Sequence, residues 1–75
     1  MISKHHTNWR MQAIQSFEKE NESDLHYSSV ITIAEDDIPR VREALIKAVE
    51  KVREIVRPSQ DEAVLCYALD LFKVV

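Results

Sequence analysis

Residues 36–57 read DDIPRVREALIKAVEKVREIVR and carry the clearest structural signal in the chain. Apolar side chains recur there at three- and four-residue spacing, which predicts one long amphipathic helix. These positions are Ile38, Val41, Leu45, Ala48, Val49, Val52, Ile55 and Val56. We expect Asp36 or Asp37 to cap the start of this helix. Pro39 fits only within the first turn, and Pro58 is expected to end the helix.

The segments on either side of this helix predict two strands. Residues 25–34 read LHYSSVITIA, and β-branched side chains of this kind pack well on a pleated surface. Residues 62–73 alternate Tyr67, Leu69 and Leu71 with smaller or polar residues, which favours a strand. The opening of that segment can also start a helix. Short connectors turn the long helix back along the sheet, so we expect parallel strands with a right-handed crossover.

The N-terminal region predicts a second, shorter helix at residues 8–21, with Trp9 and Phe17 on one apolar stripe. Residues 1–7 are expected to form a flexible lead-in, and residues 8–75 a single small α/β domain. The expected fold class is α/β (α+β), with the order helix, strand, long helix, strand and a right-handed β-α-β crossover. A two-stranded parallel sheet is rare alone, so we expect a partner chain to complete it.

The size and composition of the chain exclude several classes of protein. Its 75 residues make one domain at most, and its net charge of −3 argues against these residues binding nucleic acid alone. The absence of glycine excludes Walker-type and dinucleotide-type phosphate loops. No apolar run approaches the ~20 residues of a membrane span, and the N-terminus lacks a signal core. Cys66 is the only cysteine, which predicts a reducing, cytoplasmic setting.

Each cluster of reactive side chains has a simple structural explanation. His5 and His6 are adjacent, so they do not share a helix face, and no third metal ligand lies near them in the sequence. The acids at residues 35–37 are expected at the positive end of the helix dipole. Cys66 has no base near it in the sequence to ionise its thiol. We therefore predict a protein that is not an enzyme, with no catalytic, cofactor-binding or metal-binding residues and no cofactor.

Aromatic side chains supply the candidates for a ligand site or an interface, which are Trp9, Tyr27, Tyr67 and Phe72. A pocket near the first three would take an apolar or aromatic effector. The face of the predicted sheet that holds Phe72 is partly apolar, and a homodimer is the expected way to cover it. The alternative is that the first helix covers this face and the chain stays monomeric.

Three blocks of the stretch from Trp9 to Val74 carry a family resemblance. They are WRMQA at residues 9–13, YSSVITIAEDDIPRV at residues 27–41 and VLCYALDLF at residues 64–72. The stretch resembles a bacterial domain of unknown function that is usually found at the C-terminal end of proposed transcriptional regulators. Their N-terminal regions resemble helix-turn-helix domains. That family domain has no assigned catalytic residues.

The resemblance implies a non-catalytic regulatory or oligomerisation domain of a bacterial transcriptional regulator. The alternative is a small-molecule effector-sensing domain of the same kind of regulator. In either case, we expect DNA to be contacted only through a separate domain that is not in this chain.

Overall fold

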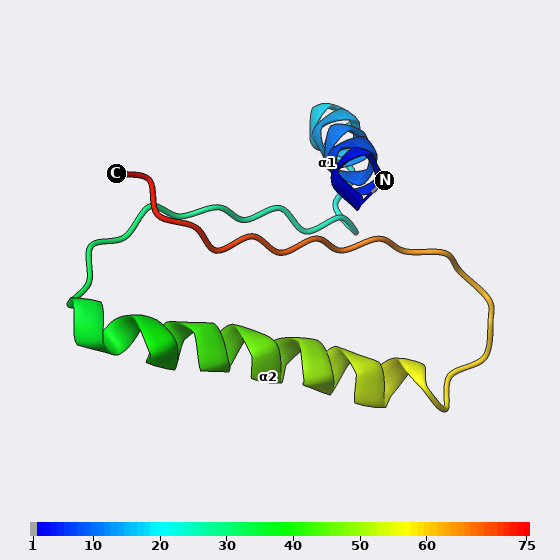
Figure 1. Ribbon diagram of the computed structural model, residues 1–75. Coiled ribbons are helices and arrows are strands. Elements are labelled where there is room, and N and C mark those ends of the chain that lie inside the picture. The colour runs from blue at the N-terminus through cyan, green and yellow to red at the C-terminus, as the bar shows by residue number, and fades with distance from the viewer. Residues whose placement is uncertain (1) are drawn as a thin grey trace. The chain divides into compact units, whose positions relative to one another are not determined.

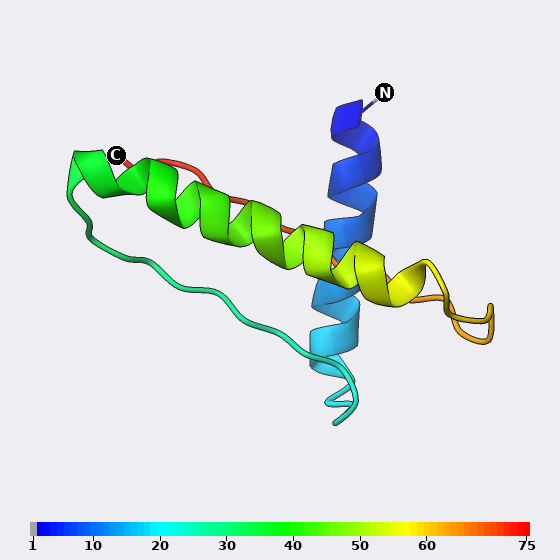
Figure 2. The same cartoon turned by 90° about the horizontal axis from the view of Figure 1, so that it is seen from below.

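The computed structural model describes residues 2–75, and its regular structure is helical (Figures 1 and 2). The element order is α1 (Ile2–Glu18), the 3₁₀ helix η1 (Glu35–Asp37) and α2 (Ile38–Val56). The chain divides into two compact units. One holds the residues up to Ser29 together with Leu65–Phe72, and the other holds Val30–Val64 together with Lys73–Val75.

Helix α2 confirms the long helix that the apolar spacing predicts. Its entry is shaped by η1, where the Asp37 N–H donates to the Ala34 carbonyl at 3.0 Å. Asp37 occupies the N-cap position, but its side chain makes no capping hydrogen bond. It forms an ion pair with Arg40 at 3.3 Å instead. At the far end, the Arg57 N–H donates to the Arg53 carbonyl, one residue before Pro58.

Helix α1 begins at residue 2, so residues 2–7, which we expected to be a flexible lead-in, are helical. The helix ends at Glu18, where the Glu20 N–H donates to the Phe17 carbonyl at 3.3 Å. Glu20 has a φ of 51°, in the left-handed region where glycine is usual. The Asn21 side chain then accepts hydrogen bonds from the Ser23 amide and hydroxyl, which is typical of a turn built on an Asn side chain.

The predicted α/β fold is wrong, because residues 2–75 contain no strand and therefore no sheet or β-α-β crossover. Residues 25–34 and 62–75 lie outside the helices. Alternating apolar side chains favour an extended backbone, but a strand also requires a ladder of backbone hydrogen bonds to a neighbour. No such ladder forms between these segments, and two strands alone are only marginally stable in water. The described chain is all-α.

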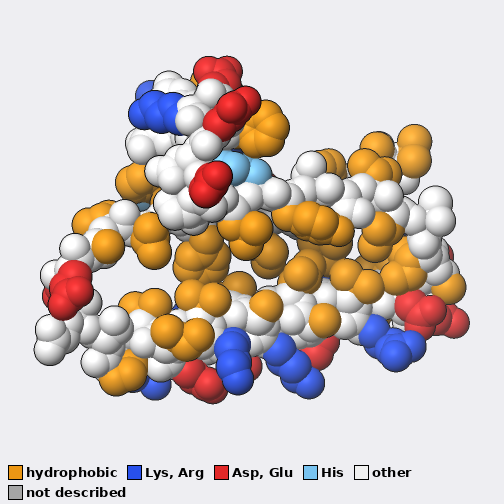
Figure 3. Space-filling view, turned by 180° about the vertical axis from the view of Figure 1, so that it is seen from behind, with side chains coloured by type: hydrophobic (Ala, Val, Ile, Leu, Met, Phe, Trp, Pro, Cys, Tyr) orange, Lys and Arg blue, Asp and Glu red, His pale blue; other side chains and the backbone are white. Residues whose placement is uncertain are grey.

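The apolar side chains are only partly covered. No side chain among residues 4–75 is buried. The best covered apolar positions form one stripe on α2 and are half-buried: Ile38, Val41, Leu45, Val49 and Val52. Ala48 and Ile55, which belong to the apolar spacing that predicts this helix, are exposed. Figure 3 shows Lys, Arg, Asp and Glu side chains along one edge of α2, so this helix is amphipathic.

Shortening Leu45 tests whether the half-buried stripe stabilises the fold. We expect Leu45→Ala to lower the free energy of unfolding by about 1–2 kcal/mol, less than the ~2–5 kcal/mol of a fully buried site. The neighbouring Ile46, which is 41% exposed, is a matched control, and Ile46→Ala should cost less. Urea denaturation followed by helical circular dichroism, at one protein concentration, gives both values. Equal losses would show that the stripe is not a packing face.

Candidate functional site

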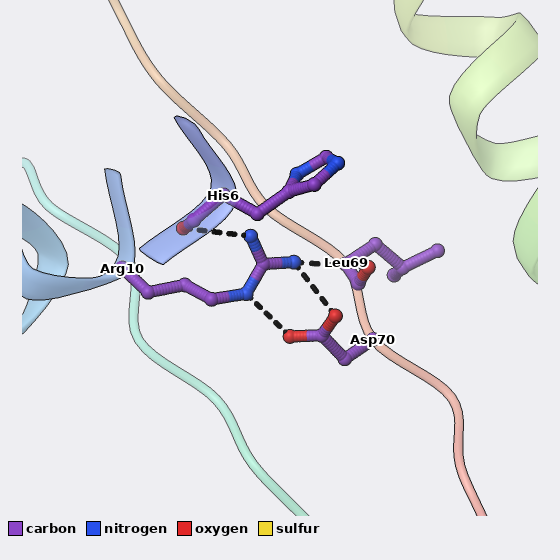
Figure 4. A network of polar contacts seen from close by, with 4 residues as sticks. All are labelled: His6, Arg10, Leu69 and Asp70. Carbon is purple, nitrogen blue, oxygen red and sulfur yellow. Dashed lines mark hydrogen bonds and ion pairs between the residues drawn. The ribbon is translucent and has the colours of Figure 1, made fainter. Parts of the chain in front are cut away.

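The best-defined polar site is a network around Arg10, in the unit that holds α1 and Leu65–Phe72 (Figure 4). Arg10 donates from Nε to Asp70 Oδ2 at 2.6 Å and from Nη2 to Asp70 Oδ1 at 2.7 Å. The two parallel bonds form the fork geometry in which guanidinium and carboxylate groups match best. Nη1 also donates to the His6 carbonyl at 3.0 Å, and Nη2 to the Leu69 carbonyl at 3.4 Å. Arg10 thus joins α1 to the extended C-terminal segment.

The electrostatics of this network follow from its geometry. The hydrogen bonds from Arg10 lower the pKa of Asp70, and the charges of Arg10 and His6 act in the same direction. The bond to Asp70 raises the pKa of Arg10 above its ordinary value. The Arg10 side chain is 30% exposed and that of Asp70 is 56% exposed, so solvent screens the pair. Each of the hydrogen bonds that Arg10 donates here goes to a group of the same chain, so this network has a structural use, and we call it the Arg10–Asp70 clamp.

A second polar cluster joins the end of α1 to the segment after it. The Ser16 hydroxyl donates to Asp24, and its oxygen lies 3.2 Å from His26 Nε2. The His26 ring also meets Phe17 edge-on, with the ring centroids 5.4 Å apart. Ser, His and Asp therefore lie together, but Asp24 contacts the serine instead of orienting the imidazole. A catalytic triad needs the acid on the other ring nitrogen of the histidine. This cluster therefore fits contacts that stabilise the turn after α1 better than it fits an activated serine nucleophile.

The acids at residues 35–37 lie in the other unit, where they form η1 directly before α2. Glu35 pairs with Lys73 at 3.2 Å, and Asp37 pairs with Arg40. Two of the three carboxylates therefore have basic partners. No group of three or more His, Cys, Asp or Glu side chains among residues 2–75 is arranged to hold a metal ion.

The four aromatic candidates are placed but not brought together. Trp9 lies on α1 and is 37% exposed, and its ring meets the His5 ring at 6.1 Å. Tyr27, Tyr67 and Phe72 lie in the extended segments of the same unit and are all exposed. No ring contact among the described residues joins any two of the four. The structure thus places all four as exposed side chains that make no ring contact with one another.

Sequence reasoning missed the Arg10–Asp70 clamp. The two residues are 60 positions apart, and neither stands in a charge pattern that marks it. The only available signal was a charged residue between two apolar ones: Arg10 between Trp9 and Met11, and Asp70 between Leu69 and Leu71.

Comparison with known proteins gives a family without an assigned activity. The model of the family described as Domain of unknown function (DUF4423) matches residues 1–74, so the chain belongs to this family. No curated protein and no solved structure matches the chain. Among the described residues, no helix is both long enough and apolar enough to cross a membrane.

Acidification tests the clamp. Because the folded state lowers the pKa of Asp70, its contribution to stability is present above the unfolded pKa and is lost as the pH falls through the folded pKa. We therefore expect Asp70→Asn to lower the melting temperature at about pH 7, and the difference from the parent to shrink as the pH falls below the ordinary aspartate pKa of about 4. Asp61→Asn is the control, because Asp61 is exposed and outside the clamp. A difference that persists in acid would show that the charge of Asp70 is not what matters.

Proposed function

We propose that this chain is a non-catalytic regulatory and oligomerisation domain of a bacterial transcriptional regulator, and that it forms a homodimer. DNA is bound only by a separate domain, and the regulator works in the cytoplasm. The family membership and the three blocks of resemblance supply the context. The exposed thiol of Cys66, the only cysteine, is consistent with a reducing compartment.

The exposed apolar side chains are the observation that carries this proposal. No side chain among residues 4–75 is buried, and Tyr27, Val64 and Leu65 are 88%, 97% and 89% exposed. A chain this small rarely stabilises itself with its own core, and association is one way to cover apolar side chains that it leaves exposed. A standard interface buries about 800 Å² per partner.

The polar clusters support a role without catalysis. Arg10 is bonded to Asp70 and to two backbone carbonyls, so its donors hold the fold together. Ser16 donates to Asp24, which leaves the hydroxyl tied to the turn. Glu35 pairs with Lys73, and Asp37 pairs with Arg40. These paired groups thus have a structural use.

An effector-sensing domain is the alternative role. It requires Trp9, Tyr27 and Tyr67 to line one pocket, and the rings make no contact with one another in the single chain. A thermal-shift screen against metabolites separates the two roles, because a ligand that binds the folded state raises its melting temperature. Consistent stabilisation by one class of ligand would favour the sensor.

Self-association is tested by light scattering across a dilution series of the purified chain. We expect a mass near twice 8.7 kDa at high concentration, with dissociation on dilution. The chain fused to a DNA-binding domain that is active only as a dimer should restore repression of a reporter gene in cells. A fusion that carries an unrelated monomeric protein is the control.

A mass near 8.7 kDa at every concentration, together with a reporter that stays unrepressed, would overturn the oligomerisation role.

A further inference from the structure

We draw no further inference here: the strongest candidate, the row of exposed apolar side chains along the extended segment Leu65–Phe72, carries no proposal, because nothing in the structure shows what covers it.

Discussion

The fork of hydrogen bonds between Arg10 and Asp70 is the contact on which the unit that contains α1 most depends. It joins residues 60 positions apart, and no ladder of backbone hydrogen bonds in the described chain links distant segments in this way. The same guanidinium reaches the carbonyls of His6 and Leu69, so one side chain fixes a helix turn and an extended segment together. Lys73 and Glu35 make a comparable link in the other unit. Side chains thus provide the long-range order that sheet hydrogen bonds provide elsewhere.

Helix α2 was predictable because its signals are local. Apolar spacing, acids before the first turn, and the two prolines all act within a few residues of the helix, so no tertiary knowledge was needed. Whether residues 25–34 and 62–73 pair as strands could not be predicted in this way. Side-chain alternation favours an extended backbone, whereas pairing depends on segments that are far apart in the sequence.

In the candidate site, too, local sequence spacing predicts some features and not others. The position of Trp9 on a helix follows from local spacing, but the Arg10–Asp70 pair does not, because nothing near either residue specifies the other. The early start of α1 was missed for a different reason. Residues 2–7 hold no hydrophobic stripe, yet their helical structure continues that of the residues that follow. An amphipathic pattern is therefore not necessary for a helix, and its absence does not mark where this one begins.

The two helices differ in how they meet solvent. The charged side chains along one edge of α2 are exposed, and its apolar stripe is half-buried. α1 has few charges, and its polar contacts are directed to its own unit through Arg10 and Ser16. The polar contacts that link segments far apart in the unit of α1 and the half-buried apolar stripe of α2 thus lie on different helices.

The left-handed backbone at Glu20 has a consequence for the unfolded chain. A side chain in this conformation costs on the order of 1 kcal/mol, and glycine would remove that cost. The sequence contains no glycine at all, so its disordered state samples fewer backbone conformations than that of an average chain. Less conformational entropy is therefore lost when the long extended segments become ordered. The conformational cost at Glu20 is therefore offset by the smaller loss of backbone entropy at the other residues.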